Sequence, residues 1–265
     1  MFQKIRLAME LVSEVARLVK LTGGVWTAGA IRDLGEETLR ARNASKEMTR
    51  GMPRSEVINS IISVINASSY LEIGVRNPAD NFNLIKCDIK HSVDPGMEFD
   101  ENPVDFPVTS DTFFEGVLPG SQGTYDVVFI DGLHHADQAY RDIGNAISRL
   151  SPSGVVILHD CMPPTRWHAR YIRTLNGPAR FEWNGTTWKA FWRFALESEF
   201  ACNLLPLDFG LGVIDTCGTK ERVSNPNPFF EYELFHQDLQ DSDLLCGLDD
   251  LLASLVESRT RAAGN

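Results

Sequence analysis

The stretch YDVVFIDGLHH, residues 125–135, decides the fold class of this chain. Its first half is a short run of apolar and β-forming residues between polar neighbours, which is the pattern of a strand buried on both faces. The run ends at Asp131, and Gly132, His134 and His135 follow at once. In parallel sheets, ligands bind beyond the carboxyl ends of the strands. We therefore expect this strand to be central and to deliver polar side chains to a crevice.

Helical and strand-like segments alternate on both sides of this strand. Upstream, SEVINSIISVINA (55–67) has helical spacing, and SYLEIGV (69–75) is a buried run that ends in a glycine turn. Downstream, VVILHD (155–160) is a second buried run. The pattern further predicts helices over 78–85, from Ser110 onward and over 136–150, a strand over 91–96, and a turn at 151–154. Alternation of this kind predicts a parallel sheet covered on both faces.

The ends of the chain carry weaker patterns. NLLPLDF (203–209) and LGVIDT (211–216) are separated only by Gly210, which predicts an antiparallel pair at a sheet edge. We also expect helices over 2–20, 167–175, 186–196 and 243–256, a helical connection or lid over 21–53, and a surface excursion over 218–235.

These patterns together predict an α/β fold: a Rossmann-like, doubly wound, mostly parallel sheet with a C-terminal antiparallel strand pair and with N- and C-terminal helices. We divide the chain into an N-terminal helical extension (1–53), a ligand-binding domain (54–217) and a C-terminal acidic segment with a helix (218–265).

Composition narrows the function classes. The formal net charge of −11 disfavours nucleic acid and anionic membrane surfaces as partners and favours a small-molecule acceptor. Charged residues interrupt the N-terminal apolar pattern, so it resembles neither a signal peptide nor a membrane span. Five cysteines without a C-x-x-C pair indicate a reducing compartment, and we expect a cytoplasmic protein. The apolar faces of the terminal helices favour a homodimer.

Glu72 and Gly74 form the first candidate site, because a glycine at the end of a parallel strand brings backbone close to a ligand. The further glycines of a dinucleotide-binding loop are absent. Asp94 lies about twenty residues after Glu72, where a carboxylate can accept both hydroxyls of a ribose. The alternative is that Asp94, before Pro95 and Gly96, only forms a turn.

A second candidate site combines two strand ends. Asp131, His134 and His135 follow one predicted strand, and His159 and Asp160 end the neighbouring one. Neighbouring carboxylates and imidazoles offer proton transfer or metal ligation. The alternative for the histidines is structural, in which one caps the following helix and His159 lies in the core.

At this point the chain resembles a known family, the small class I S-adenosylmethionine methyltransferases that act on sugars and other small molecules. The matching stretches are YLEIGVRNP (70–78), SVDPG (92–96), VTSDTFFEG (108–116), YDVVFIDGLHHADQAYRDI (125–143) and SGVVILHDCMPP (153–164). Their order and spacing are more specific than any one motif.

The resemblance implies that the chain is an enzyme that methylates a hydroxyl of a sugar or secondary metabolite. It implies S-adenosylmethionine as cofactor, bound by Glu72, Gly74, Asp94, Ser110, Asp111, Asp131 and His134. The catalytic base is expected among His134, His135 and His159. Relatives of this kind hold a divalent metal at positions similar to Asp131 and Asp160, so Mg²⁺ is implied as well. The sequence departs from those relatives at Cys161, where they tend to place another oxygen ligand.

Two other functions remain open from the residues alone. One is a nicotinamide or nucleotide-sugar enzyme on a similar sheet, which the missing glycines disfavour. The other is a non-catalytic S-adenosylmethionine-binding protein. The aromatic residues over 186–192 are expected in the core rather than in a substrate wall. Trp167 and His168 are open to two interpretations, a lid or a packed loop.

Overall fold

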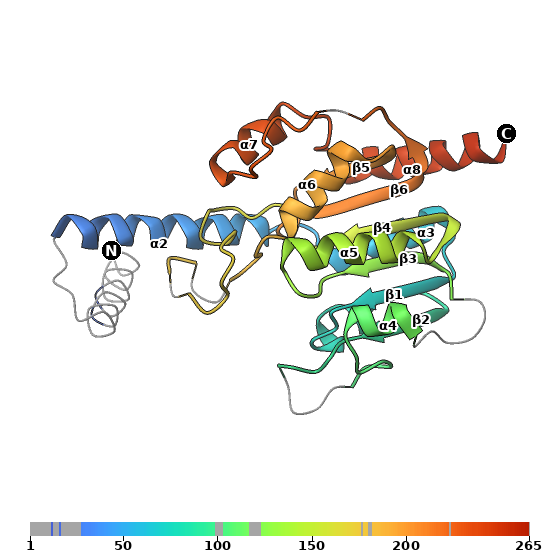
Figure 1. Cartoon of the computed structure of the whole chain (residues 1–265), viewed down its shortest axis with the longest axis horizontal. Coiled ribbons are helices and arrows are strands. Elements are labelled where there is room, and N and C mark those ends of the chain that lie inside the picture. Colours follow the sequence, from blue (N-terminus) through green and yellow to red (C-terminus); the bar gives the residue numbers. More distant parts are fainter. Residues whose placement is uncertain are drawn as a thin grey trace.

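The computed structural model describes residues 28–98, 103–116, 123–175, 177–179, 182–222 and 224–264, together with residues 12 and 16. Within this part of the chain, a mixed sheet has the strand order β2-β1-β3-β4-β6-β5 (Figure 1). Its strands are β1 (Ser69–Ile73), β2 (Ile89–Val93), β3 (Tyr125–Ile130), β4 (Leu150–Leu158), β5 (Phe200–Leu205) and β6 (Leu211–Thr219).

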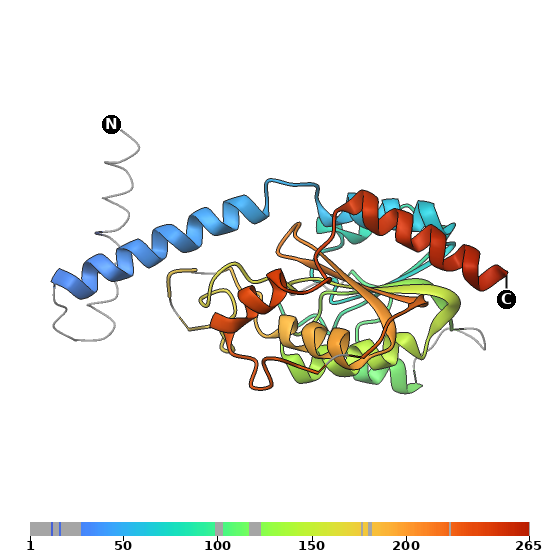
Figure 2. The same cartoon turned by 90° about the horizontal axis from the view of Figure 1, so that it is seen from above.

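Helices cover both faces of the sheet. In Figure 2, α3 (Arg54–Ile65) and α8 (Leu248–Ala263) lie on one face, and α4 (Ser110–Gly116), α5 (Ala136–Ile147) and α6 (Thr187–Glu197) lie on the other. The helix α2 (Ala28–Met48) extends away from the sheet. The remaining elements are α7 (Tyr232–Gln240) and two short 3₁₀ turns, η1 (Pro78–Asp80) and η2 (Phe82–Leu84).

Alternation along the central strands produces two hydrophobic cores. On β3, Val128 and Ile130 face the core beneath α5 and α6, whereas Val127 and Phe129 face the core beneath α3 and α8. All four side chains are buried. A strand buried on both faces must be apolar throughout, which is why YDVVFI reads as a continuous apolar run.

The parallel pairing places the ends of several strands at one edge. β1 pairs in parallel with β2 and β3, and β3 pairs in parallel with β4. β6 is antiparallel to both β4 and β5, so β5 runs in the same direction as β4. The segments that follow β1, β2, β3, β4 and β5 therefore meet at the carboxyl edge of the sheet.

The predicted fold class is confirmed. The sheet is mostly parallel, with β5 and β6 as the C-terminal antiparallel pair. The helices predicted over 55–67, from Ser110, over 136–150 and over 186–196 correspond to α3, α4, α5 and α6. α2 is a continuous helix within the segment 21–53.

Several local predictions are wrong. The segment 78–85 forms the two 3₁₀ turns instead of a helix, because Asn81 between them has φ −149° and ψ −59°. The segment 167–175 forms turns rather than a helix. The segment 151–154 belongs to β4, which begins at Leu150 with an irregular pairing to β3. The strand predicted over 91–96 is β2, which ends at Val93 before the turn.

The C-terminal boundaries also differ from the prediction. The excursion predicted over 218–235 gives way to α7 at Tyr232, and the final helix, α8, runs from Leu248 to Ala263. Apart from residues 12 and 16, the helix predicted over 2–20 lies outside the described residues. No helix in the described part of the chain is long and apolar enough to cross a membrane.

Candidate functional site

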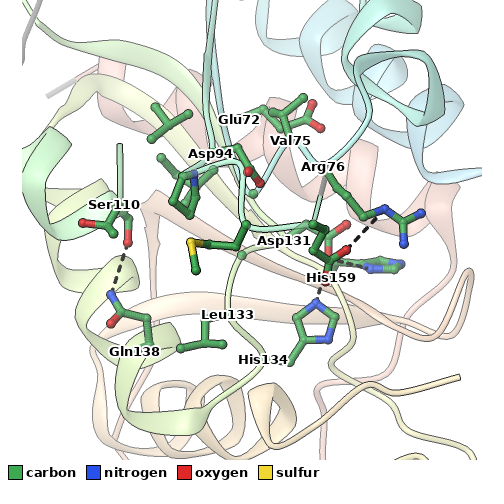
Figure 3. A pocket seen from close by; sticks show the side chains of 18 of the residues that line it. Glu72, Val75, Arg76, Asp94, Ser110, Asp131, Leu133, His134, Gln138 and His159 are labelled. Carbon is green, nitrogen blue, oxygen red and sulfur yellow. Dashed lines mark hydrogen bonds and ion pairs between the residues drawn. The ribbon is translucent and has the colours of Figure 1, made fainter. Parts of the chain in front are cut away.

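A cavity of about 470 Å³ opens at the carboxyl edge of the sheet (Figure 3). Its walls come from the segments after β1, β2, β3 and β4 and from the start of α4. Ser110 and Gln138 lie at one end, and Asp131, His134 and His159 lie at the other. The cavity also contains the predicted residues Glu72, Gly74, Asp94, Asp111 and Asp160 in its lining. The sequence-based candidates therefore converge on one space, with the exception of His135.

Gly74 allows the segments after β1 and β3 to lie against each other. Its φ is +91°, and a Cβ atom at this position would lie 2.2 Å from the carbonyl oxygen of Asp131. Its backbone N–H donates to the carbonyl oxygen of Val93 at 2.8 Å. Only glycine combines this conformation with such a close approach of backbone. Gly74 therefore fixes how closely these two segments lie together in the cavity wall.

Asp94 forms the turn that the sequence offered as one interpretation, and its residue also lines the cavity. One carboxylate oxygen, Oδ1, accepts a hydrogen bond from the backbone N–H of Gly96 at 2.7 Å, which is turn chemistry. Gly96 has φ +70°, as a turn of this kind requires. Asp94 also lines the cavity. The turn thus fixes a carboxylate in the wall of the cavity.

Gln138 connects Ser110 and Asp111 at the α4 end of the cavity. Its side-chain amide lies 3.2 Å from Oγ of Ser110 and donates to Oδ1 of Asp111 at 3.0 Å. Gln138 is in the first turns of α5 and lines the cavity. The hydrogen bond from Gln138 lowers the pKa of Asp111. The sequence analysis missed this residue, because a glutamine on a helix carries no motif.

Glu72 is a buried acid on β1. Tyr70 donates to its Oε2 atom at 2.6 Å, and Asn81 donates to the same atom at 2.9 Å. Burial raises the pKa of Glu72 to about 7, although these two hydrogen bonds oppose the shift. Glu72 is only 3% exposed but lines the cavity. Its charge at neutral pH is therefore sensitive to its surroundings.

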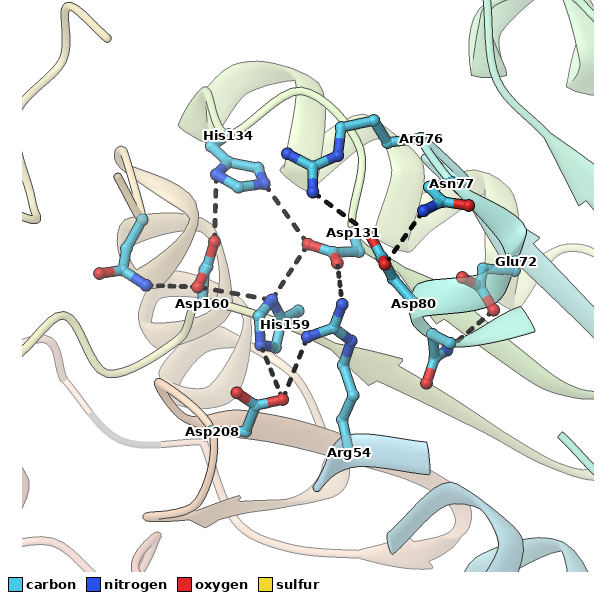
Figure 4. Close-up of polar contacts among 12 residues, drawn as sticks. Arg54, Glu72, Arg76, Asn77, Asp80, Asp131, His134, His159, Asp160 and Asp208 are labelled. Carbon is cyan, nitrogen blue, oxygen red and sulfur yellow. Dashed lines mark hydrogen bonds and ion pairs between the residues drawn. The ribbon is translucent and has the colours of Figure 1, made fainter. Parts of the chain in front are cut away.

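Asp131 lies at the centre of a network of charged side chains (Figure 4). Its Oδ1 atom is 3.1 Å from Nδ1 of His159 and 3.4 Å from Nε2 of His134, and its Oδ2 atom is 3.8 Å from the guanidinium of Arg54. Burial alone would raise the pKa of Asp131. The charge of His159, the hydrogen bonds from both histidines and the charge of Arg54 instead lower it.

His159 and His134 both face Asp131 and Asp160, but His159 also faces Asp208. Besides Asp131, Nε2 of His159 faces Asp208 at 3.6 Å. Burial opposes the charged form of His159, but the two neighbouring acids Asp131 and Asp160 raise its pKa well above the usual 6.5. Burial likewise disfavours charge on His134, while Asp160 and Asp131 raise its pKa above 6.5. Carboxylates therefore hold His159 as an imidazolium on both sides of its ring.

Both ring nitrogens of His134 face protein acceptors, and Nε2 lies 3.4 Å from Oδ1 of Asp131. Nδ1 lies 2.9 Å from the carbonyl oxygen of Trp183 and 3.1 Å from Oδ2 of Asp160. The indole ring of Trp183 stacks on the imidazole with ring centroids 5.0 Å apart. In the neutral ring, the carbonyl oxygen of Trp183 favours a proton on Nδ1, so the basic nitrogen is Nε2, which faces Asp131.

The other aromatic and imidazole side chains considered in the sequence analysis do not line the cavity. His135 stacks on Tyr171 at 4.4 Å and does not line the cavity. Trp188 and Trp192 are fully buried, as expected for core residues. His168 is also buried, and it contacts Ser45 of α2 at 2.8 Å. The segment around His168 is therefore packed against α2.

Asp131, His134 and Asp160 form a group whose ligand atoms lie within 4.8 Å of one another. This group does not fit Mg²⁺, which prefers oxygen ligands, because an imidazole lies against both carboxylates. Asn184 also donates to Asp160. The thiol of Cys161 is buried and directed at the carbonyl oxygens of Leu158 and His159, so it supplies no oxygen.

Asp160 has φ +60°, a conformation that non-glycine residues rarely adopt. Burial raises its pKa, and the charges of His159 and His134 oppose that shift. Strained backbone of this kind is concentrated at functional sites.

Two residues of this network were missed by sequence reasoning. Arg54 begins α3, and its guanidinium lies 3.1 Å from Asp208 as well as near Asp131. Asp208 follows β5 at the carboxyl edge of the sheet. Asp208 lies within the run predicted as a strand over 203–209, and an acid near the end of such a run was a usable signal. Arg54 had none, because it precedes the first strand of the sheet.

Comparison with known proteins supplies the family. The family model described as "Methyltransferase domain" matches residues 25–161, which is more than half of the 265-residue chain. A comparison with curated proteins gave no match.

Solved structures with low sequence identity give distant matches. The O-methyltransferase TomG from Streptomyces achromogenes is 14% identical, with a TM-score of 0.44 over 68% of this chain and 89% of that one. An O-methyltransferase from Bacillus cereus is 11% identical, with a TM-score of 0.44 over 76% of this chain and 97% of that one. A putative caffeoyl-CoA O-methyltransferase from Staphylococcus aureus is 16% identical, with a TM-score of 0.42 over 76% and 97%.

The family match spans β1, β2, β3 and β4 and ends at Cys161, the residue after Asp160. It therefore covers all the cavity-lining residues except Arg173 and Trp183. The chain belongs to the family described as the methyltransferase domain.

Proposed function

We propose that this methyltransferase transfers the methyl group of S-adenosylmethionine to a hydroxyl of a small molecule such as a sugar or a secondary metabolite. The observation that best supports this proposal is that four residues line one cavity. Gly74 and Asp94 supply a glycine turn and a fixed carboxylate, and Asp131 and His134 supply an acid and an imidazole. The first pair suits a nucleoside, and the second pair suits proton transfer from an acceptor.

The cofactor end of the cavity fits the parts of S-adenosylmethionine. Asp94 is placed to accept the ribose hydroxyls, and Ser110 and Asp111 are placed to contact the adenine. Glu72 and Asp131 are placed nearer the methionine end. The tight contact at Gly74 supports this assignment, since a Cβ atom there would collide with the backbone of Asp131 and force the segments after β1 and β3 apart. When bound, S-adenosylmethionine supplies an electrophilic methyl group on a positively charged sulfur.

His134 is the proposed base among the three histidines. With its proton on Nδ1, its Nε2 atom can take the proton of the acceptor hydroxyl as the oxygen attacks the methyl carbon. Asp131 and Asp160 then stabilise the imidazolium that forms. His159 is less suited to this role because its side chain is only 8% exposed, against 20% for that of His134, and because a third acid, Asp208, faces its ring. His135 lies outside the cavity lining.

The rest of the catalysis is alignment. Methyl transfer is an in-line displacement, so the protein gains most by holding the acceptor oxygen behind the methyl carbon. Trp183 and Leu133 provide apolar surface in the cavity lining for the body of an acceptor. The mechanism uses no Mg²⁺, because His134, His159 and Asn184 already engage Asp131 and Asp160.

The proposal places cofactor binding and catalysis within residues 54–217, since the residues that line the cavity run from Arg54 to Trp183. It requires a small-molecule acceptor and no nucleic acid. A homodimer is compatible with it but is not needed to complete the described cavity.

Calorimetric titration with S-adenosylmethionine and its demethylated product tests the cofactor. Wild type is compared with Asp94→Ala and with the matched control Asp88→Ala, which removes an exposed acid next to β2. We expect wild type and the control to bind both compounds and Asp94→Ala to bind at least about tenfold more weakly, as for lost charged hydrogen bonds. Absence of binding to wild type would refute the cofactor assignment.

A mass-spectrometric assay with a panel of sugar and phenolic hydroxyl acceptors tests the reaction. We expect a product that is heavier by one methylene unit and is formed only with S-adenosylmethionine. Binding of the cofactor without product formation from any acceptor would favour a non-catalytic binding protein. Binding of a nicotinamide dinucleotide in its place would favour an oxidoreductase.

A further inference from the structure

Arg54 lies at the N-terminus of a helix, a position that disfavours a cation. It is the first residue of α3, and the partial positive charge of a helix N-terminus repels a guanidinium. Its side chain is only 23% exposed, yet it lines the cavity. A residue that breaks a local rule at a cavity is expected to serve the site. The acids around Arg54 offset its unfavourable position.

Asp208 anchors the guanidinium of Arg54. Asp208, Phe209 and Gly210 have φ values of +44°, +63° and +92°, so three successive left-handed residues form the turn between β5 and β6. The backbone N–H of Asp208 donates to the carbonyl oxygen of Met48 at 3.0 Å. A Cβ atom at Gly210 would lie 2.4 Å from Met162, so the turn is tightly packed. The carboxylate of Asp208 is therefore held in a defined place.

The four carboxylate oxygens of Asp131 and Asp160 already face nitrogen donors. Asp131 faces His159 and His134 with Oδ1 and Arg54 with Oδ2. Asp160 faces Asn184 and His159 with Oδ1 and His134 with Oδ2. A divalent cation bound between these acids would displace several of these contacts. It would also lie close to a permanently charged guanidinium, which costs electrostatic energy.

We propose that Arg54, held by Asp208, takes the place of a divalent cation at the acceptor end of the cavity, and that the protein acts without a metal ion. Arg54 offsets the negative charge of Asp131 and fixes its Oδ2 atom, so that Oδ1 stays directed at the two histidines. Arg54 is thus a positioning residue. Its role in catalysis rests on the proposed methyltransferase function, whereas the absence of metal binding does not.

The test is binding of Mn²⁺, measured by electron paramagnetic resonance and calorimetry on the full chain after dialysis against chelator. Five proteins are compared: wild type, Arg54→Met, Arg54→Lys, Asp131→Asn and the control Arg50→Met. Arg50 lies four residues away, is exposed and pairs with Glu47 rather than with the cavity acids. Circular dichroism and thermal melting establish which variants are folded.

We expect wild type, Arg54→Lys and Arg50→Met to show no saturable Mn²⁺ binding. Arg54→Met should gain a saturable site for one Mn²⁺ ion, because the cavity acids lose their fixed cation. In addition, chelator should leave methyl transfer by wild type unchanged. Stoichiometric Mn²⁺ or Mg²⁺ binding by wild type that is lost in Asp131→Asn would overturn the proposal.

The outcomes separate this inference from the proposed function. A wild type that binds S-adenosylmethionine and also requires a metal would refute the role of Arg54 and leave the methyltransferase reaction standing. A wild type that binds neither ligand would refute the function and leave the metal-free site supported. A folded Arg54→Met variant that gains no Mn²⁺ site would contradict the claim that Arg54 fills the place of a cation.

Discussion

At the Gly74 end of the cavity, the acids Glu72 and Asp94 accept hydrogen bonds from uncharged donors, whereas at the Asp131 end acids and cations form one network (Figure 4). The first end comes from the segments after β1 and β2, together with the start of α4. The second end draws on the starts of α3 and of the loops after β3, β4 and β5. Both ends share the contact between Gly74 and the carbonyl oxygen of Asp131.

This difference separates two kinds of sensitivity to mutation. Backbone geometry at the cofactor end tolerates changes of charge better than changes of shape. The acceptor end tolerates neither loss of an acid nor loss of its cation, because a buried charge without its partner is costly. Four substitutions probe this contrast.

The largest effect is expected for Gly74→Ala, which acts on both ends. The added Cβ would lie 2.2 Å from the carbonyl oxygen of Asp131, at a φ of +91° that alanine adopts only with strain. We expect a large fall in melting temperature and loss of S-adenosylmethionine binding, by calorimetry. In the control Gly144→Ala, the added Cβ would lie in open space on α5, and the change should stabilise the protein by about 0.5–1 kcal/mol. Cofactor binding by Gly74→Ala at wild-type affinity would contradict the packing argument.

The second effect is confined to the acceptor end. His134→Gln removes the proposed base, and we expect the turnover rate to fall by about 10²–10⁴-fold, the usual contribution of general base catalysis. S-Adenosylmethionine affinity should change little. His135→Gln is the matched control, since His135 stacks on Tyr171 outside the cavity lining. If the two variants lose activity equally, His134 is not the base.

The pH profile of wild type sharpens this prediction. The base acts only in its neutral form, so the rate should fall as the pH drops through the pKa of His134. Neighbouring Asp160 and Asp131 raise that pKa above 6.5, although burial opposes them. We therefore expect the acidic limb of the rate profile to have its midpoint above 6.5 and to be absent in His134→Gln. A midpoint well below 6.5 would contradict this environment.

The third effect concerns stability at the cofactor end. Burial raises the pKa of Glu72 from 4.5 to about 7, so the folded protein holds this proton more tightly than the unfolded chain. This contribution to stability is complete below pH 4.5 and is lost as the pH rises to about 7. Glu72→Gln removes the dependence and keeps an acceptor for the hydroxyl of Tyr70.

Urea unfolding at about pH 5 and about pH 8 measures the free energy of unfolding. Between these two conditions, the free energy of unfolding of Glu72→Gln should rise relative to that of wild type by on the order of 3 kcal/mol. Glu56→Gln, an exposed change on α3, is the control and should show no such gain. Equal pH dependence in Glu72→Gln and wild type would show that Glu72 is not the titrating group.

The smallest effect is expected for Gln138→Ala. Its amide contacts Ser110 and the carboxylate of Asp111, and a lost hydrogen bond costs about 0.5–1.5 kcal/mol with a neutral partner and about 1.5–3 kcal/mol with a charged one. We expect a several-fold weaker affinity for S-adenosylmethionine in calorimetry and an unchanged turnover rate at saturation. Gln237→Ala, on the exposed side of α7, is the control. A fall in turnover without a change in affinity would place Gln138 at the acceptor instead.

Sequence reasoning succeeded where one strand end carries its own signal. Buried apolar runs predict strands, and parallel strands bring their carboxyl ends to one edge, so Asp131 and Asp160 could be placed side by side. The helix predicted over 78–85 failed for a tertiary reason. Asn81 leaves helical geometry and donates to the buried Glu72 of β1. Local periodicity carries no information about that partner.

The sequence by itself determined the sheet, its two apolar faces and the edge at which the site lies, because these depend on patterns within short segments. Only the tertiary structure decided that Arg54 and Asp208, which lie 154 positions apart, complete the charge network around Asp131. It also decided that His134 rather than His135 lines the cavity. The physical reason is that the pairing of buried charges depends on distances in space, which residue spacing does not encode.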